Sequence, residues 1–181
     1  MKTFGLVFSG GGVRALAHAG VLKALEEHDL HPAVISGTSG GALVGALYAS
    51  GKTPEQLIDF FKKTPLFKFS MFSLGKMGLI NSNKYPALFE KYLSCTTFEE
   101  LSIPLYVAAT NLLSGKITYF SKGDLIAPMI ASSALPPYFS PIKIDEGVYC
   151  DGGLLNNFPI EPLRAPGRDA AGNNSPLIAW L

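Results

Sequence analysis

The chain has 181 residues, of which 48% are apolar and 16% charged, and its formal net charge is +1. This balance is typical of one globular domain with a sizeable core, and it excludes a largely disordered chain. The near-zero charge, without a long basic run, argues against a nucleic-acid partner. Two cysteines and three histidines are too few and too scattered for a disulfide scaffold or a metal cluster. We therefore expect free thiols, no metal ion and no cofactor.

The first third of the chain alternates between predicted strands and predicted helices. Apolar runs at 3–9 and 33–36 predict buried strands, and apolar spacing predicts helices at 14–28, 40–50 and 54–63. Strands that alternate with helices are typical of a parallel sheet covered by helices. The predicted fold class is therefore α/β, with a mostly parallel central sheet flanked by helices in three layers.

The remaining predicted elements are less regular. A helix is predicted at 83–93, two strands at 103–110 and 116–120, and a further helix at 125–134. A short apolar run, 148–150, ends at Asp151-Gly152-Gly153.

Membrane-spanning and targeting signals are not expected in this sequence. Small residues at Gly41, Gly45 and Ala49 give the 40–50 helix a smooth face that can sit close to a sheet, whereas a membrane dimer motif needs a longer apolar segment. The chain has no run of 18 apolar residues, and the stretch 4–8 is too short for a signal peptide. We therefore expect a cytoplasmic protein.

The strongest single motif is Gly37-Thr38-Ser39-Gly40-Gly41, which fits the pattern G-x-S-x-G. It lies where a predicted strand meets a predicted helix, which is the context that a nucleophile elbow requires. Residues without a Cβ are needed two positions either side of a serine on such a sharp turn. The start of the helix would stabilise negative charge nearby. An ordinary glycine turn before a helix is the alternative interpretation.

A glycine-rich loop, Ser9-Gly10-Gly11-Gly12-Val13-Arg14, follows the first predicted strand. Such loops often bind phosphates, but the Lys-Ser/Thr pair of a P-loop and the acidic ribose ligand of a dinucleotide site are both absent. The loop can instead present backbone N–H groups to an oxyanion, as acyl transfer needs. Arg14 would fix the loop or add positive charge, unless this is a plain turn with a solvated arginine.

A serine nucleophile needs a base, and the histidines do not supply one. His18, His28 and His31 all precede Ser39, so the order serine, acid, histidine is absent. His18 falls inside the first predicted helix, where we expect it to be packed. His28 and His31 flank the end of that helix and are expected to be exposed.

A carboxylate that acts directly on the serine is the remaining choice, and Asp151 is the best candidate. It ends an apolar run, and Gly152 and Gly153 after it allow another loop to come close. An ordinary Asp-Gly turn is the alternative.

Taken together, these motifs resemble the patatin-like phospholipase family over residues 4 to about 163. The loop 10–14 is similar to the family's oxyanion loop, 37–41 to its nucleophile elbow, and 151–153 to the motif of its catalytic aspartate. The flanking stretches 16–22 and 156–159 also look familial. The resemblance implies a lipid acyl hydrolase that uses a serine–aspartate dyad and an acyl-enzyme, without a metal.

The resemblance also implies a role for each site residue. Asp151 would take the proton from Ser39 as the hydroxyl attacks an ester carbonyl, and would act again as the base when water hydrolyses the acyl-enzyme. The implied oxyanion donors are the backbone N–H groups of Gly10, Gly11, Gly12 and Gly40. The implied supporting residues are Arg14, Gly37, Gly41, Gly152 and Gly153.

Two parts of the chain stand apart from these motifs. The segment 65–80 is apolar and weakly cationic without a clear period, and we expect it to contact a lipid surface or, alternatively, to fill the core or a dimer contact. Family members commonly continue well beyond the aspartate motif. The prediction is therefore a hydrolase domain over 1–163 and an irregular or truncated tail over 164–181, in which 175–181 is either a last strand or an unnatural end.

Several functions remain open from sequence. The leading one is hydrolysis of (lyso)phospholipids or related acyl lipids by a cytoplasmic enzyme, with peripheral membrane contact through 65–80. An acyltransferase or thioesterase would use the same acyl-enzyme. The two non-enzymatic alternatives are an inactive lipid-binding domain and a nucleotide-binding module.

Overall fold

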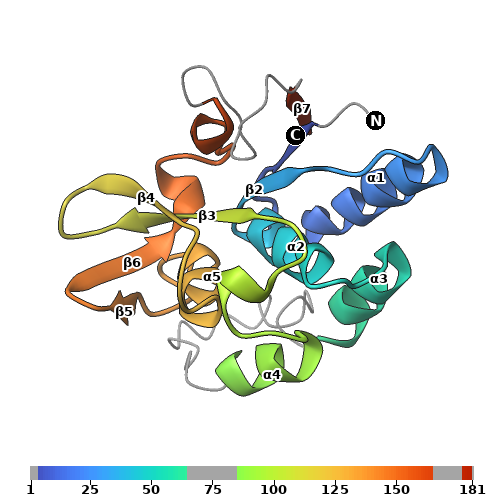
Figure 1. Cartoon of the computed structure of the whole chain (residues 1–181). Coiled ribbons are helices and arrows are strands. Elements are labelled where there is room, and N and C mark those ends of the chain that lie inside the picture. Colours follow the sequence, from blue (N-terminus) through green and yellow to red (C-terminus); the bar gives the residue numbers. More distant parts are fainter. Residues whose placement is uncertain (1–3, 65–84, 165–176, 181) are drawn as a thin grey trace.

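The computed structural model describes residues 4–64, 85–164 and 177–180. Helices and strands alternate in the first half, and strands dominate the second (Figure 1). The helices are α1 Leu16–Glu27, α2 Gly40–Ala49, α3 Pro54–Lys63, α4 Tyr85–Tyr92 and α5 Ile126–Ser132. The strands are β1 Gly5–Phe8, β2 Val34–Thr38, β3 Leu105–Asn111, β4 Lys116–Phe120, β5 Ile142–Ile144, β6 Gly147–Asp151 and β7 Leu177–Trp180.

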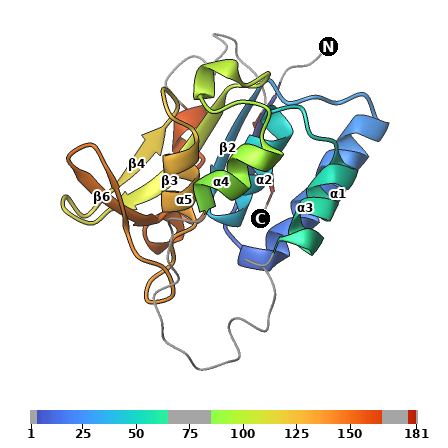
Figure 2. The same cartoon turned by 90° about the horizontal axis from the view of Figure 1, so that it is seen from below.

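The strands form one open sheet in the order β5-β6-β3-β2-β1-β7, and β4 also pairs with β3. The neighbours β7, β1, β2 and β3 are parallel, whereas β4, β5 and β6 are antiparallel to the strands they pair with. Helices α1 and α3 pack against each other, and both contact α2, as Figures 1 and 2 show. The predicted α/β class, with a mostly parallel sheet flanked by helices, is confirmed.

The apolar runs form strands because both faces of the parallel half are covered. In β1, Leu6 and Phe8 face the main core under the helices, and Val7 belongs to a smaller cluster on the other face. Leu163, in the short helical turn Glu161–Leu163, is part of that smaller cluster. Strands buried on both faces read as nearly continuous apolar runs, which is why they were predictable.

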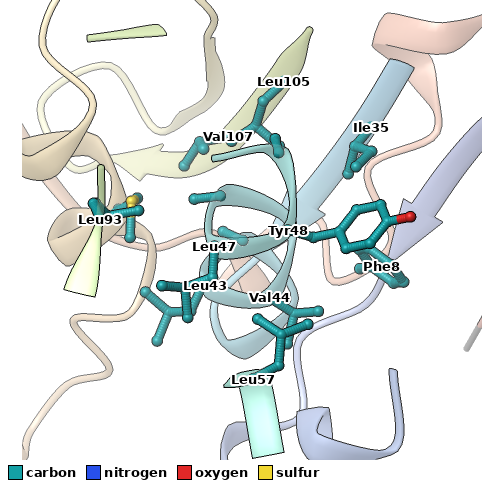
Figure 3. Close-up of a cluster of buried hydrophobic side chains, with 14 of the residues drawn as sticks. Phe8, Ile35, Leu43, Val44, Leu47, Tyr48, Leu57, Leu93, Leu105 and Val107 are labelled. Atoms are coloured by element: carbon teal, nitrogen blue, oxygen red, sulfur yellow. The ribbon is translucent and has the colours of Figure 1, made fainter. Parts of the chain in front are cut away.

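Helix α2 lies at the centre of the main core, and all of its residues are buried (Figure 3). Its small face is toward the sheet. A Cβ on Gly45 would lie 3.1 Å from both the Ile35 Cγ2 and the Leu105 Cδ1 atoms, so this position has little room for a larger side chain. The prediction of a smooth helix face against a sheet is confirmed.

Strand β3 brings the ends of β2 and β6 together. Residues 107 and 108 of β3 pair with both β2 and β4, and residues 109–111 pair with both β4 and β6. Since a strand has two edges, β2 and β6 share the edge of β3 opposite β4. Strand β2 is parallel to β3 and β6 is antiparallel, so their carboxyl ends point toward each other, with Thr38 opposite Ala108 and Asp151 opposite Ala109.

Several local predictions differ from the structure. The helix predicted at 14–28 is preceded by the 3-10 turn Gly12–Ala15, so that α1 itself begins at Leu16 and ends at Glu27. Strand β5, only three residues long, was not predicted, because a run this short carries no periodic signal.

The last strand, one of the two alternatives for 175–181, is present as β7 beside β1. The predicted irregular stretch 165–176 and the segment 65–80 lie outside the described residues.

Two other expectations concern single features. Cys95 and Cys150 are both free thiols, as predicted. Among the described residues, no helix has the length and apolar character needed to cross a membrane.

Candidate active site

Ser39 occupies a strained turn between β2 and α2. Its backbone has a φ of 52° and a ψ of −125°, a combination that is uncommon for a residue with a side chain. The residues two positions before and after Ser39 must be glycine because a side chain there would not fit. A Cβ on Gly37 would lie 2.7 Å from the Gly41 carbonyl oxygen, and a Cβ on Gly41 would lie 2.5 Å from the carbonyl oxygens of both Phe8 and Ser9. The predicted role of Gly37 and Gly41 therefore has a steric basis.

The Ser39 hydroxyl donates a hydrogen bond to Asp151, with a distance of 2.7 Å between Oγ and Oδ2. This contact follows from the shared edge of β3, where the ends of β2 and β6 meet. Asp151 is only 4% exposed. Its other carboxylate oxygen, Oδ1, accepts a hydrogen bond from the Gly153 N–H at 2.8 Å. The structure thus places the predicted nucleophile and the predicted base in direct contact.

The backbone of Asp151 is fixed independently of its carboxylate. The Asp151 N–H donates to the Ala134 carbonyl at 3.0 Å, and the Thr110 hydroxyl donates to the Asp151 carbonyl at 2.9 Å. Gly152 fits beside β3 because a Cβ at this position would overlap the Ala108 carbonyl oxygen. Gly152 and Gly153 therefore allow the close approach that their sequence position suggested.

Burial changes the acidity of the Asp151 carboxyl. Removal from water raises its pKa, and the hydrogen bonds from Ser39 and Gly153 only partly offset this effect. A carboxylate with a raised pKa is a stronger proton acceptor.

No histidine takes part in the hydrogen bonds of Ser39 and Asp151 in the part of the chain that the structure describes. His18 is buried against the Phe8 ring, with 4.8 Å between the ring centroids, and its Nε2 lies 3.0 Å from the Ser9 carbonyl oxygen. Burial lowers the pKa of His18. His28 and His31 are exposed. The expected packing of His18 and exposure of the other two are confirmed.

The glycine loop packs directly on the elbow. A Cβ on Gly40 would lie 2.7 Å from the Gly12 carbonyl oxygen, so the two segments are nearly in contact. Gly12 begins a 3-10 turn and Gly40 begins α2. The first N–H groups of a helical turn have no hydrogen-bond partner within that turn, and Gly12 and Gly40 hold these first positions. The Gly10 N–H is different because it donates to the Asn157 carbonyl at 3.1 Å.

Arg14 contributes to this loop through its backbone. Its N–H donates to the Gly11 carbonyl at 3.1 Å and closes the turn, while its side chain is exposed.

Ser132, at the end of α5, was not singled out from the sequence. Its hydroxyl accepts a hydrogen bond from the Ser39 N–H at 2.8 Å and donates one to the Ala108 carbonyl at 2.6 Å. The side chain is fully buried. Ser132 therefore ties the backbone of the strained residue to the centre of β3. The polar residue within an otherwise apolar helix was the only available sequence signal.

Asn156 and Asn157 hold the elbow and the glycine loop together. The Thr38 hydroxyl donates to the Asn156 carbonyl at 3.0 Å, and the Asn157 side-chain amide donates to the Gly10 carbonyl at 3.2 Å. The Asn156 amide in turn donates to the Tyr119 hydroxyl at 2.9 Å and to Glu161 at 2.7 Å. In the sequence, the two asparagines stand out only as part of the familial stretch 156–159.

A model of the patatin-like phospholipase family matches residues 6–164, which include the elbow, the glycine loop and Asp151. The chain belongs to this family. The match agrees with the resemblance that the motifs indicated. All the site residues described above lie within the matched range.

Patatin-like relatives with known names are similar over most of this chain but are longer. An uncharacterised NTE family protein of Mycobacterium bovis is 31% identical over 166 residues, which are 91% of this chain and 46% of that protein. Lysophospholipase nte1 of Aspergillus fumigatus is 28% identical over 177 residues, covering 93% of this chain and 11% of that protein. The chain thus spans less than half the length of these curated relatives.

Solved structures share the fold at low sequence identity. VipD from Legionella pneumophila superposes with a TM-score of 0.65 at 17% identity, covering 88% of this chain and 47% of VipD. ExoU from Pseudomonas aeruginosa, solved in complex with SpcU, gives a TM-score of 0.53 at 20% identity, covering 75% of this chain and 39% of the matched chain. These likenesses support the patatin-like fold.

Proposed function

We propose that this chain is a lipid acyl hydrolase that cleaves carboxylic esters of (lyso)phospholipids or related acyl lipids through a dyad of Ser39 and Asp151. The observation that carries the proposal is the 2.7 Å hydrogen bond from the Ser39 Oγ to a buried carboxylate. Membership of the patatin-like phospholipase family and the similarity to a protein named lysophospholipase support the lipid substrate class.

The reaction runs through an acyl-enzyme. Asp151 Oδ2 takes the proton of the Ser39 hydroxyl while Oγ bonds to the ester carbonyl carbon. The tetrahedral oxyanion is stabilised by backbone N–H groups of Gly11, Gly12 and Gly40. The carbon–oxygen bond to the alcohol then breaks, and Asp151 returns its proton to that alcohol. Water repeats the sequence on the acyl-enzyme, releasing the fatty acid and restoring Ser39.

The strained elbow and the raised pKa of Asp151 have distinct roles in this mechanism. The elbow exposes Oγ beside the start of α2, where the helix dipole favours the developing negative charge. Burial makes the carboxylate a better base than an exposed aspartate. Gly10, whose N–H is engaged by Asn157, acts by fixing the loop rather than as an oxyanion donor.

The direct test is labelling with a fluorophosphonate probe and turnover of a soluble acyl ester. The wild-type chain is expected to label and to hydrolyse the ester, and Ser39→Ala is expected to do neither, because it lacks the attacking oxygen. Ser94→Ala, at an exposed serine, is the matched control and should label like the wild type. A folded wild-type chain that neither labels nor turns over ester would contradict the proposal.

Ser132→Ala is expected to lower kcat by about tenfold to a hundredfold with little change in KM, since an unsatisfied buried N–H costs about 1–3 kcal/mol and would let the Ser39 backbone relax. Ser133→Ala is the matched control in the same segment, because the buried Ser133 hydroxyl has no hydrogen-bond partner among the described residues. Steady-state kinetics on a soluble ester measure kcat and KM for both variants. Equal kinetics for the two variants, at equal thermal stability, would show that Ser132 does not position Ser39.

A further inference from the structure

We infer that four exposed apolar side chains around the dyad, Val13, Leu135, Leu154 and Leu155, form a rim that docks the chain on a lipid surface. The inference rests on the proposed function, since it assigns the physical state of the substrate on which the same site acts. It uses none of the residues 65–80, which lie outside the described part of the chain.

Each rim residue lies next to an atom that contacts the dyad or the elbow. Val13 follows Gly12, whose carbonyl approaches Gly40. Leu135 follows Ala134, whose carbonyl accepts the hydrogen bond from the Asp151 N–H. Leu154 follows Gly153, whose N–H donates to the Asp151 carboxylate, and Leu155 donates its own N–H to the Gly152 carbonyl. Three separate segments therefore bring apolar side chains to one small region.

These side chains are exposed, although the chain has a well-packed core elsewhere. Val13 is 45% exposed, Leu135 39%, Leu154 50% and Leu155 53%. Single exposed leucines are ordinary on a protein surface, but apolar residues gathered at one place mark an interaction site. The gathering here surrounds the one serine–carboxylate pair that the structure forms among its described residues.

Charge is missing from two of the three segments, whereas the exposed Arg14 follows Val13 in the third. No charged residue occurs between Asp124 and Lys143, nor between Asp151 and Glu161, in a chain whose overall charged fraction is 16%. Residues 135–138 are all exposed and none of them is charged. Exposed loops of a protein that faces only water normally carry charge, whereas a surface that enters the boundary of a lipid layer must avoid burying it.

A lipid surface fits these observations better than a second copy of the chain. The proposed acyl-lipid substrate resides in such a layer, and the uncharged segments that carry Leu135, Leu154 and Leu155 can enter it without burying a charge.

The test is binding of the chain to phosphatidylcholine vesicles, measured by co-flotation in the Ser39→Ala background so that the lipid stays intact. Replacing both Leu154 and Leu155 with Ser is expected to weaken vesicle binding by about tenfold or more, because two leucine side chains lose their transfer into the lipid. The matched control replaces Leu112 and Leu113, an exposed consecutive pair beyond the end of β3, and should bind like its parent. Thermal unfolding checks that both variants are folded.

The outcomes separate this inference from the proposed function. Loss of vesicle binding in the Leu154/Leu155 variant alone supports the rim, whether or not soluble ester is hydrolysed by the wild type. Equal loss in both double variants, no binding by the parent chain, or a change in oligomeric state on sedimentation without a change in vesicle binding would each overturn the rim. Hydrolysis of a soluble ester by a chain that does not bind vesicles would leave the dyad standing and reject the docking surface.

Discussion

Asp151→Asn is expected to lower kcat/KM for ester hydrolysis by about 10²–10⁴-fold while the chain stays folded. The amide is nearly the same shape as the carboxylate, and its oxygen can still accept the hydrogen bond that Gly153 donates to Oδ1. It cannot take the proton from Ser39, because the Oδ2 acceptor of that proton becomes an N–H₂ donor. The effect is therefore on the chemical step rather than on the architecture of the site.

The pH dependence gives this prediction a second, independent readout. Asp151 must be ionised to act as a base, so activity should fall as the pH falls through its folded-state pKa, which burial raises. The folded state then binds the proton more tightly than the unfolded state. The contribution of Asp151 to stability is fully present below the unfolded pKa and is lost as the pH rises through the folded pKa. Activity and this part of the stability therefore change in opposite directions across the same pH window.

Steady-state rates on a soluble ester and thermal unfolding, both followed over pH, measure the two effects. Asp124→Asn is the matched control, since Asp124 also accepts backbone hydrogen bonds, from Ile126 and Ala127, but contacts no serine hydroxyl within the described ranges. We expect Asp124→Asn to keep the acid limb of the wild-type rate profile. If Asp151→Asn retained the wild-type rate, the base would have to be another group.

The elbow was predictable because its requirements are local. A strand, a serine on a sharp turn and a helix must follow one another in sequence, and the space around the turn demands glycine at fixed offsets. The structure shows the reason for those offsets in the short approaches of Gly37 and Gly41 to neighbouring backbone. A pattern of five residues thus carried most of the information about this half of the site.

The contact between Ser39 and Asp151 was not predictable from local patterns, because it depends on pairing across the sheet. Their separation of 112 positions in sequence is bridged only when β2 and β6 meet at the same edge of β3. The apolar run before Asp151 indicated a strand but not its direction. The resemblance to the patatin-like phospholipase family supplied that link. The residues alone were equally consistent with an ordinary Asp-Gly turn at Asp151.

Ser132 and Asn157 show a second limit of sequence reasoning. Both act through hydrogen bonds to backbone groups far away in the chain, and such contacts leave no spacing or periodicity in the sequence. The same limit applies within the glycine loop. Sequence treats Gly10, Gly11 and Gly12 alike, whereas the structure commits the Gly10 N–H to the Asn157 carbonyl.

Gly41→Ala is expected to destabilise the fold by about 1–3 kcal/mol, as overpacking of a well-filled core does, and to reduce probe labelling of Ser39. The added Cβ would lie 2.5 Å from the carbonyl oxygens of Phe8 and Ser9. Both atoms belong to the backbone at the end of β1, so neither can move aside as a flexible side chain would. The first turn of α2 must shift instead, and Ser39 precedes that turn.

Gly20→Ala is the matched control because it makes the same substitution within α1, where an added Cβ would meet nothing within 4 Å. There the change should raise the free energy of unfolding by about 0.5–1 kcal/mol, since alanine is the better helix former. Urea unfolding of the two variants measures the difference, and opposite signs are expected from one chemical change. If Gly41→Ala were as stable as the wild type, the approach of α2 to β1 would not limit this position. The glycine would then be required only for the conformation of the turn.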